Sequence, residues 1–412
     1  MRIAIVANDT RGGIQPYVAL GLGLRRAGHE VRFLAPADFA DMVEGAGLPF
    51  LPLAGGVELA VRGSGGVAAQ GSVASTRFAM RELPKRLFTW TKETLAGCEG
   101  VDVMVGGLGG MVLGLSVAEK LKVPFVEAHL QPIGAPTDAY PGVLLSGTPS
   151  WLGGWGRRLS HRLSDAALWV AFRPAMAKAR RELLGLGGKL KVEGDGASLY
   201  GFSHHVVPMP QDGRRERILT GYWTLPAPAD WKPSEALQAF LAKSGPVVTI
   251  GFGSMPSGDP QALTALVIGA VRKAGVRAVL VAGWGGMAKA EAADDVFMAE
   301  TVPYDWLLPH VRGLVHHGGA GTTGAGLTSG TPSLVVPFMM DQPFWGARVA
   351  ALGAGPAPIP KAKLTEANLA EALRVLVSDE EMRARAKTLG EQLRAEDGVG
   401  AAVEHFNRLA KG

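Results

Sequence analysis

The residues with the clearest chemical potential lie late in the chain, in residues 313–345, GLVHHGGAGTTGAGLTSGTPSLVVPFMMDQPFW. The apolar run at 314–317 predicts a buried strand, and the glycines after it predict a turn that a ligand can approach closely. Residues 322–328 then predict a helix that Gly330 ends. A strand, a glycine turn and a helix start direct N–H groups and the positive end of the helix dipole to one point. This arrangement favours an anion, most often phosphate.

Side chains that suit phosphate and sugar groups flank this turn. His317 can donate to phosphate, and Thr322 adds a hydroxyl and a backbone N–H at the helix start. Asp341 and Gln342 lie just past the strand predicted at 333–338 and offer acceptors and donors for sugar hydroxyls. Because open α/β sheets bind ligands at the carboxyl ends of their strands, we expect these groups to lie near one another.

Two residues after earlier predicted strands complete a donor site for a nucleotide sugar. Ser254 lies in the glycine turn after the strand predicted at 247–251, pointing at the same crevice. Trp284 follows the strand predicted at 278–282, where its ring can stack on a nucleobase. A phosphate seat, a pair of groups for sugar hydroxyls and a stacking ring together indicate a nucleotide-sugar transferase.

A second interpretation remains open on these residues alone. Residues 319–324 form a literal G-x-G-x-x-G, and Asp341 follows 17 residues later, near the distance expected for a ribose-binding acid. That pattern favours an NAD-dependent oxidoreductase. Against it, the pattern comes late in its domain, two histidines precede it, and Gln342 follows Asp341 directly, which suits a polyol as well as a cofactor ribose.

The elements that must position these groups form two series of alternating strands and helices. The chain has 412 residues and 47% hydrophobic content, enough for two domains. Predicted strands begin at residues 3, 31, 49, 101, 123 and 205, and a second series begins at residues 247, 278, 296, 314 and 333. Other predicted elements are a helix that begins at Pro16, a long glycine-rich loop at 57–75, a helix between Asp259 and Gly275, and a helix from 379 with a capping box of Ser378 and Glu381. The alternation is typical of an α/β protein with two doubly wound, Rossmann-like domains that face each other across a cleft. We expect domains at 1–207 and 235–392, joined by a linker at 208–234.

Composition indicates a compartment and excludes some partners. Cys98 is the sole cysteine, which excludes an internal disulfide and fits a reducing compartment. The N-terminal apolar run is too short for a secretory signal, and no run of about 20 apolar residues is present. We therefore expect a cytoplasmic protein, as a monomer or weak dimer. No metal site is expected, because strand alternation points neighbouring histidines such as His204 and His205 to opposite faces.

Residues 151–191 are strongly basic and contain interleaved aromatic residues. This pattern is compatible with peripheral contact to an anionic membrane surface. The favoured interpretation is a solvated helix whose apolar side, with Leu168, Phe172 and Met176 at helical spacing, packs inward. Nucleic acid is not expected, since no binding motif accompanies the charge.

Four stretches of the chain carry a specific resemblance: GFGSM at 251–255, TGYW at 220–223, VHHGGAGTTGAGLTSGTPSLVVPFMMDQPFWGARV at 315–349, and TRGGIQPYVALGLGLRRAGHEVRF at 10–33. They resemble GT-B glycosyltransferases of the sterol 3β-glucosyltransferase and antibiotic aglycone glycosyltransferase type. The resemblance implies an inverting, metal-independent transfer of a hexose from a nucleoside diphosphate sugar to a hydroxyl of a hydrophobic acceptor such as a sterol, polyketide or lipid. UDP-glucose is the expected donor, dTDP-sugars come next, and no cofactor is expected.

The resemblance also implies roles for individual residues. The diphosphate would be bound by His317, Gly319, Gly321 and Thr322, with Ser254 near the phosphate next to the nucleoside. Trp284 would stack on the base, the backbone of Val302 would contact its edge, and Asp341 with Gln342 would hold the sugar. The segment 393–412 would be a helix that returns to the N-terminal domain.

One position departs from the family pattern. The N-terminal turn Thr10, Arg11, Gly12, Gly13 is expected at the cleft, and relatives commonly carry an acid or histidine where this chain has Gly13. Glycine cannot accept a proton. Asp9 in the same turn and His129 after the strand predicted at 123–128 are the candidate replacements for the catalytic base. An acidic acceptor that needs little help, and a sugar-nucleotide-binding protein with impaired catalysis, remain alternatives.

Overall fold

The computed structural model describes residues 1–55, 73–187, 189–210, 216–255, 258–283, 287–288 and 293–411. Among the described residues the chain divides into two compact units, one of 1–55, 73–225 and 396–411, the other of 226–395. Most of the long loop predicted at 57–75 lies outside the described residues. Each unit has its own sheet and its own core.

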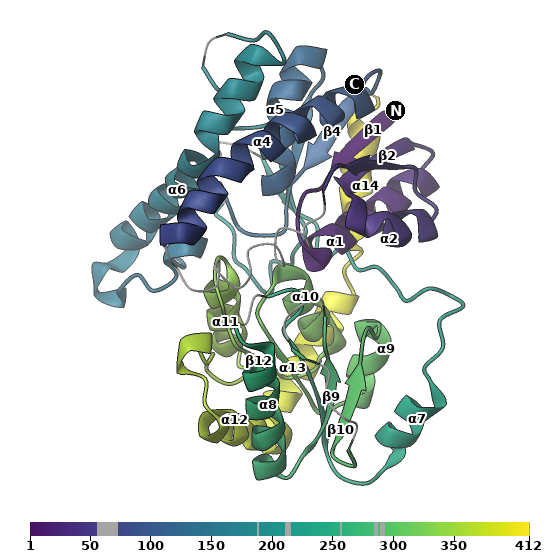
Figure 1. Ribbon diagram of the computed structural model, residues 1–412, viewed down its shortest axis with the longest axis vertical. Coiled ribbons are helices and arrows are strands. Elements are labelled where there is room, and N and C mark those ends of the chain that lie inside the picture. The colour runs from purple at the N-terminus through teal and green to yellow at the C-terminus, as the bar shows by residue number, and fades with distance from the viewer. Residues whose placement is uncertain are drawn as a thin grey trace. The chain divides into compact units, whose positions relative to one another are not determined.

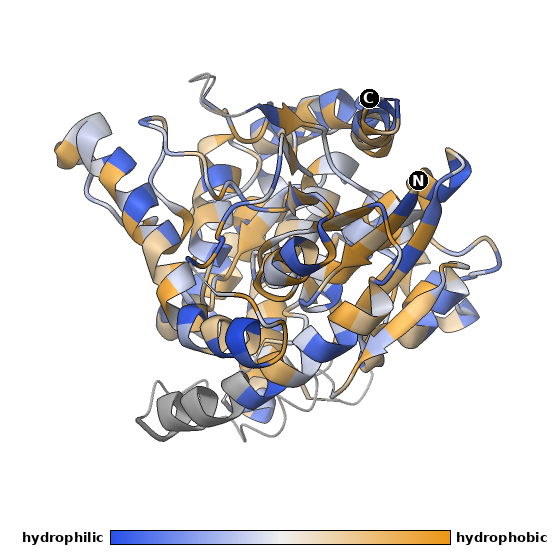
Figure 2. Cartoon of the chain, turned by 90° about the horizontal axis from the view of Figure 1, so that it is seen from above, coloured by the Kyte–Doolittle hydropathy of each residue, from blue (hydrophilic) through white to orange (hydrophobic). Residues whose placement is uncertain are grey.

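The first unit is built on a seven-stranded parallel sheet of order β3-β2-β1-β4-β5-β6-β7. Its strands are near-continuous apolar runs, as expected for strands covered on both faces by helices. Figure 2 shows the strands mostly orange, whereas the helices are striped blue and orange. The bounds are β1 Arg2–Val6, β2 Glu30–Pro36, β3 Phe50–Leu53, β4 Val103–Gly106, β5 Phe125–His129, β6 Ser198–Tyr200 and β7 Arg217–Leu219.

The helices of this unit are α1 Arg11–Arg26, α2 Ala40–Gly45, α4 Val73–Gly97, α5 Leu108–Leu121, α6 Gly153–Glu182 and α14 Gly398–Leu409, with single 3-10 turns η1 Ala37–Phe39, η3 Val143–Leu145 and η4 Ser150–Leu152. The last helix, α14, packs against α1, as Figure 1 shows. Gly23 permits the close approach, because a Cβ there would lie 2.2 Å from Val399 Cγ1. His29 joins the two ends of the unit by a 3.0 Å hydrogen bond between Nε2 and Asn407 Oδ1. The predicted return of the C-terminal helix to the first unit is confirmed.

The second unit has a five-stranded parallel sheet of order β10-β9-β8-β11-β12. The strands are β8 Val247–Gly251, β9 Arg277–Val281, β10 Val296–Ala299, β11 Gly313–His316 and β12 Ser333–Val335. The helices are α7 Glu235–Ala242, α8 Pro260–Ala274, α9 Tyr304–Leu307, α10 Ala320–Ser329, α11 Gln342–Ala351, α12 Glu366–Ser378 and α13 Glu380–Arg394. The 3-10 turns are η5 Leu308–His310 and η6 Lys361–Lys363. Two parallel doubly wound sheets confirm the predicted α/β class.

Helix caps in the second unit follow sequence signals with one exception. Asp259 caps α8 by accepting from Ala262 N at 2.9 Å, and Gly275 ends that helix in the left-handed conformation, as predicted. The capping box predicted from Ser378 and Glu381 is wrong. Asp379 caps α13 instead by accepting from Met382 N, because the Ser378 hydroxyl is turned back to Arg374 O.

Two predictions in the first unit are wrong. The helix predicted from Pro16 begins at Arg11, because Thr10 is extended and its carbonyl accepts from Gly13 N and Ile14 N. Pro16 lies inside α1, where it lacks one backbone donor. The strand predicted at 205–207 is a turn, in which Val206 N and Val207 N both donate to Ser203 O. β7 lies within the segment 208–234 that the sequence predicts as a linker.

Within the described residues, no helix is long and apolar enough to cross a membrane.

Candidate functional site

The glycine turn after β11 has the geometry of an anion seat. His316 ends β11, Gly318 has φ +92°, and Gly319 is the extended N-cap of α10. A Cβ at Gly318 would lie 2.7 Å from Val335 Cγ1 and 3.0 Å from Gln342 O, so only glycine fits. The first turn of α10 contains no acidic residue, and its residues up to Thr322 are half-buried and reachable. The N–H groups of this turn therefore present a positive end to a ligand.

His317 lies over this turn. A Cβ at Gly319 would be 2.6 Å from its Nε2, and a Cβ at Gly253 would be 3.2 Å from its Cε1, so the ring lies against two glycine backbones. Burial lowers the pKa of His317 to about 4, so the ring is neutral at pH 7. Its Nδ1 is buried without a hydrogen-bond partner among the described residues. A neutral imidazole still carries one N–H, which can donate to a phosphate oxygen.

His316 has a different role. It is fully buried, and its Nδ1 accepts from Gly318 N at 3.1 Å, which braces the turn from below. Burial lowers its pKa to about 3. The rings of His316 and His317 are 6.4 Å apart and nearly perpendicular, in line with the expectation that only one of them reaches the ligand side.

Asp341 and Gln342, at the start of α11, both form hydrogen bonds within their own part of the chain. Gln342 is buried, and its Oε1 accepts from Phe338 N at 2.7 Å and from Met339 N at 3.1 Å. This pairing orients the amide, and Nε2 lies 3.0 Å from Met255 Sδ. Asp341 Oδ2 accepts from Trp345 Nε1 at 3.0 Å. Gln342 therefore shapes the loop that presents Asp341, a function the sequence did not indicate.

The other residues expected at the donor site are Ser254, Val302 and Trp284. Ser254 is half-buried directly after Gly253, which has φ +59°. Gly283 approaches the same turn so closely that a Cβ on it would lie 2.5 Å from Gly253 O. Val302 is half-buried after β10. Trp284 lies outside the described residues.

In the first unit, the carboxylate of Asp9 fills the space that a side chain at position 13 would take. A Cβ on Gly13 would lie 2.2 Å from Asp9 Cγ and 2.3 Å from its Oδ2. Asp9 is exposed, and its Oδ1 accepts from Thr10 N at 2.6 Å. The carboxylate of Asp9 thus takes the place beside Gly13, beyond the carboxyl end of β1. Of the other turn residues, Arg11 and Gly12 open α1.

His129, the last residue of β5, belongs to a buried polar cluster. Its Nε2 lies 2.9 Å from Glu127 Oε2, and only 2% of its surface is exposed. Glu127 also accepts from Ser198 Oγ at 3.0 Å and from Gly194 N at 2.6 Å. His129 Nδ1 is buried without a partner among the described residues. Glu127 is not among the residues that the sequence indicates, although a carboxylate two residues before His129 in a strand lies on the same face.

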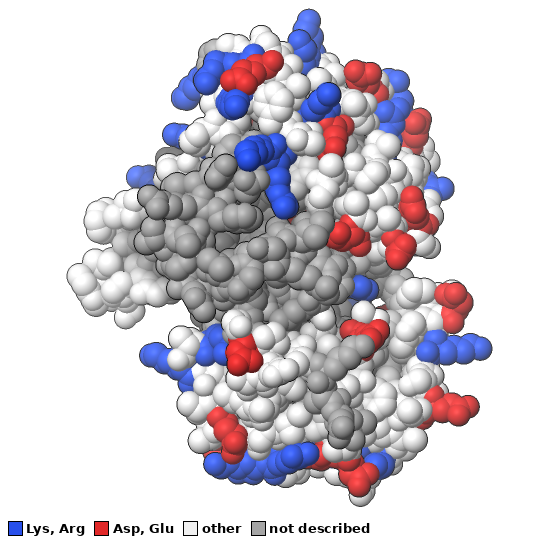
Figure 3. All heavy atoms as spheres, viewed as in Figure 1, with Lys and Arg blue, Asp and Glu red and all other residues white. Residues whose placement is uncertain are grey.

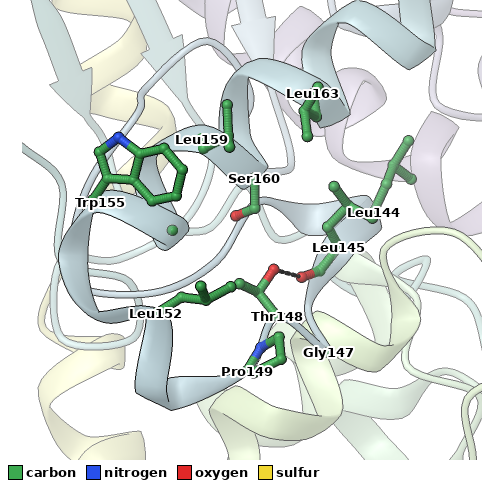
Figure 4. A pocket seen from close by; sticks show the side chains of 11 residues that line it. Leu144, Leu145, Gly147, Thr148, Pro149, Leu152, Trp155, Leu159, Ser160 and Leu163 are labelled. Atoms are coloured by element: carbon green, nitrogen blue, oxygen red, sulfur yellow. Dashed lines mark hydrogen bonds between the residues drawn. The ribbon is translucent and has the colours of Figure 1, made fainter.

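An apolar pocket lies in the first unit at the start of α6. Its volume is about 550 Å³, and Figure 4 shows leucine side chains and Trp155 around it, with Ser160 as a polar group. The lining includes Leu144, Leu145, Leu152, Trp155, Leu159 and Leu163. One turn further along α6, burial raises the pKa of Asp165 to about 6, and Asp165 interacts electrostatically with His129 and Glu127. The pocket and the polar cluster are therefore linked by α6.

The basic segment at 151–191 has both a buried apolar face and exposed aromatic side chains. Leu168 and Met176 are buried, so one face of α6 packs inward. Trp151 and Trp155 are 81% and 71% exposed, and Val170 is 62% exposed. The end of this segment that projects at the left of Figure 1 shows no charged side chain in the same view in Figure 3.

Comparisons with known proteins agree with this geometry. A profile for the glycosyltransferase family 28 N-terminal domain matches residues 3–135, and one for the C-terminal domain of erythromycin biosynthesis protein CIII-like proteins matches residues 281–403. Two sterol 3-beta-glucosyltransferases of Arabidopsis thaliana are each 32% identical over 98% and 99% of this chain. The chain covers 65% and 68% of their lengths, but only 29% of a 33% identical sterol 3-beta-glucosyltransferase of Neosartorya fischeri.

Solved structures show the same fold at lower identity. The glycosyltransferase of kitacinnamycin has a TM-score of 0.69 at 20% identity, over 99% of this chain and 98% of that one. SnogD from Streptomyces nogalater has a TM-score of 0.66 at 22% identity, over 99% of each chain. VinC, solved in complex with dTDP, has a TM-score of 0.66 at 19% identity, over 100% of each chain. The chain belongs to the GT-B glycosyltransferases, in the group that contains sterol 3-beta-glucosyltransferases and antibiotic glycosyltransferases.

Proposed function

We propose that this protein transfers a hexose, with inversion, from a nucleoside diphosphate sugar to a hydroxyl of a hydrophobic small molecule. The observation that carries the proposal is the turn after β11, where His317 lies against Gly253 and Gly319 beside the start of α10. This seat suits a diphosphate, which is the leaving group of such a transfer. Family membership favours this reading over an NAD-dependent oxidoreductase that would use the same glycines.

The donor we propose is UDP-glucose, with dTDP-sugars as the second choice. Glucose follows from the names of the relatives that are 32% identical over nearly the whole chain. The structural similarity to VinC, whose structure contains dTDP, keeps the second donor in consideration. Gly319, Gly321, Thr322 and His317 would bind the diphosphate, with Ser254 beside it. Asp341, on the loop that Gln342 braces, would hold the hexose.

The acceptor we propose is a sterol or a similarly apolar molecule. The relatives named above act on sterols, and the pocket of about 550 Å³ in the first unit is lined mainly by leucine side chains. Such a pocket suits an apolar body with few polar groups. Ser160 adds a hydroxyl among the lining side chains.

Asp9 is the general base in this proposal. Its carboxylate is exposed and occupies the space above Gly13. The carboxylate takes the proton of the acceptor hydroxyl while the oxygen attacks the anomeric carbon. The bond from that carbon to the phosphate oxygen breaks, and its electron pair leaves with the diphosphate. The N–H groups at the start of α10 stabilise the resulting charge.

His129 is the second candidate for the base. Glu127 would hold Nε2 as the protonated nitrogen, which leaves Nδ1 to accept a proton, in the manner of a carboxylate–histidine pair. Its exposure of 2% favours Asp9, because the acceptor hydroxyl must reach the base. pH–rate profiles of Asp9→Asn and His129→Ala distinguish the two, and losses below about a hundredfold in both indicate an acceptor that needs little help.

A peripheral membrane contact through residues 151–191 is a second proposal for the first unit. Exposed Trp151 and Trp155 beside Arg157 and Arg158 suit an anionic lipid surface. Sedimentation with phosphatidylserine vesicles tests it, and the variant with both tryptophans replaced by serine is expected to stay in the supernatant. Equal sedimentation of both proteins would contradict it.

Two measurements test the main proposal. Tryptophan fluorescence is titrated with UDP, dTDP and NAD, and UDP is expected to bind and NAD not to bind. Transfer of labelled glucose from UDP-glucose to a sterol and to a panel of hydroxylated acceptors then separates an enzyme from a binding protein. Binding of NAD in place of UDP, or binding of UDP without transfer to any acceptor, would contradict the proposed function.

A further inference from the structure

A cluster of two histidines and a glutamate lies in the first unit, outside the set of residues discussed so far. His204 and His205 lie in the turn after β6, and their ring centroids are 3.9 Å apart. The strand that the sequence predicts here would point the two side chains to opposite faces. Because Val206 N and Val207 N both donate to Ser203 O, the segment is a turn and brings the two rings to the same side.

The glutamate comes from the other end of the chain. Glu396 begins the C-terminal segment of the first unit, two residues before α14. Its Oε1 accepts from Ser203 Oγ at 2.7 Å and lies 3.4 Å from His204 Nδ1. Its Oε2 is buried and has no hydrogen-bond partner among the described residues. An unsatisfied carboxylate oxygen is costly when buried, which makes it a specific indication that a ligand is missing.

Gly221 packs closely against this oxygen. A Cβ on Gly221 would lie 2.9 Å from Glu396 Oε2, and its φ of +93° also favours glycine. Access from solvent is open, because the side chain of His204 is 66% exposed while that of Glu396 is 18% exposed. A small ion can therefore enter from the histidine side and reach the carboxylate.

We propose that His204, His205 and Glu396 bind one divalent transition-metal ion, zinc in the first place. One ligand atom from each residue lies within 4.8 Å of the others. Two imidazoles and one carboxylate are a donor set that zinc commonly takes, with water in the fourth position. A tetrahedral site with metal–ligand distances of about 2.0–2.1 Å separates neighbouring ligand atoms by about 3.3 Å, close to the separation of His204 Nδ1 and Glu396 Oε1. Rotation of the exposed His204 side chain would bring its ligand atom within binding distance of the ion.

The ion would join two distant parts of the chain. The turn after β6 belongs to the body of the first unit, whereas Glu396 is the point where the chain re-enters that unit before α14. Zinc would therefore hold α14 against the rest of the unit and reduce its local opening. None of the three residues is among those proposed above for binding the donor, binding the acceptor or taking the proton.

The test uses the full chain without a histidine tag, freed of metal with a chelator. Zinc chloride is titrated by calorimetry, and Co²⁺ is used as a spectroscopic probe of tetrahedral coordination. We expect one ion per chain, together with slower amide exchange in α14. In His204→Asn and Glu396→Gln, zinc affinity is expected to fall by at least about tenfold, since even loss of a residue that only orients a ligand has this effect. His310→Asn, a substitution at an exposed histidine of the second unit, serves as the matched control.

His204 is so exposed that its replacement leaves the fold intact, which circular dichroism of each variant checks. Absence of zinc binding in the native chain would overturn the proposal. Zinc binding that is the same in His204→Asn, Glu396→Gln and the native chain would also overturn it, because the ion would then be held elsewhere. In either case UDP binding is measured on the same samples, so that failure of the metal site is not confused with failure of the proposed transferase activity.

Discussion

The turn from β1 to α1 and the turn from β11 to α10 share one architecture and have opposite electrostatics. Each leads from the carboxyl end of a central parallel strand into a helix, and each is rich in glycine. At the start of α10 the glycine backbone is covered by the neutral ring of His317, and the first turn has no acidic residue. At the start of α1 the space above Gly13 is filled by the carboxylate of Asp9.

This difference shows how one local structure serves two kinds of chemistry. A helix start attracts anions when only N–H groups and neutral donors face the ligand. When a carboxylate lies at the helix start, its negative charge repels an anion and the carboxylate can accept a proton. In both turns a glycine makes room for the side chain that decides the outcome. Substitutions at the two turns should therefore affect different steps of transfer, which four predictions test.

The largest effect is expected at Asp9. In Asp9→Asn, kcat is expected to fall by about 10²–10⁴-fold because the base is lost, while the Kd for UDP stays unchanged. Steady-state kinetics and fluorescence titration measure the two quantities. Asp41→Asn, at an exposed carboxylate of α2 in the same unit, is the matched control. If Asp9→Asn keeps the kcat of the native chain, Asp9 is not the base.

Gly319→Ala is expected to affect donor binding. The new Cβ would lie 2.6 Å from His317 Nε2, so the ring must move off the turn. Crowding of this kind costs about 1–3 kcal/mol, which corresponds to a loss of about 5- to 150-fold in affinity for UDP. Calorimetry measures the loss. Gly45→Ala, where no atom lies within 4 Å of the added Cβ, is expected to bind UDP like the native chain.

Adjacent glycines in α1 give the sharpest comparison. Gly13→Ala places a Cβ 2.2 Å from Asp9 Cγ and is expected to lower kcat by about tenfold or more through displacement of the carboxylate. Gly12→Ala meets nothing within 4 Å and is expected to keep kcat. Gly12→Ala should also raise the free energy of unfolding by up to about 1 kcal/mol, since alanine favours the helix. Equal kcat values in both variants would show that Asp9 is not held above Gly13.

The smallest effect is a pH dependence of local stability. The pKa values of His316 and His317 are lowered by burial to about 3 and about 4, below the ordinary value of 6.5. The unfolded chain therefore binds protons first, so the stability around α10 is complete above pH 6.5 and falls as the pH drops toward 4. Asp165 has a pKa raised to about 6, so the region around α6 loses stability as the pH rises from about 4 to 6.

Hydrogen exchange of α10 and α6 peptides, followed from pH 4 to 7, measures these opposite slopes. The slope for α10 is expected to decrease in His317→Asn, while the slope for α6 stays unchanged. Slopes of the same sign in α6 and α10 would contradict the assignment of these buried groups.

Most of the fold follows from the sequence because its signals are local. Apolar runs predict β1 to β5 and all strands of the second sheet, and Asp259 with Gly275 brackets α8 as predicted. The short strands β6 and β7 are not predicted, because three residues give too little pattern. The start of α1 was placed at Pro16, since proline is common near helix starts. The real start at Arg11 depends on the extended conformation of Thr10, which residue types do not reveal. The turn at 203–207 has β-branched and apolar residues that favour a strand, but hydrogen bonds to Ser203 O override them.

For the candidate site, the sequence predicts the glycine turn after β11 but not the side-chain contacts around it. The glycines and His317 form a local pattern that indicates a phosphate seat. The engagement of Gln342 with Phe338 N and Met339 N, and the buried pair of His129 with Glu127, depend on side-chain conformations in the folded chain. The position of Asp9 over Gly13 depends on a contact between residues four apart in a turn and a helix. Residue spacing alone does not settle such contacts.

The contact between Asp9 and Gly13 also restricts how this turn can evolve. An aspartate placed at position 13 would put its Cβ 2.2 Å from Asp9 Cγ, so the carboxylate of Asp9 would have to turn away. Exchange of both residues, aspartate for glycine at each position, would remove the collision. The residue tolerated at either position therefore depends on the residue at the other.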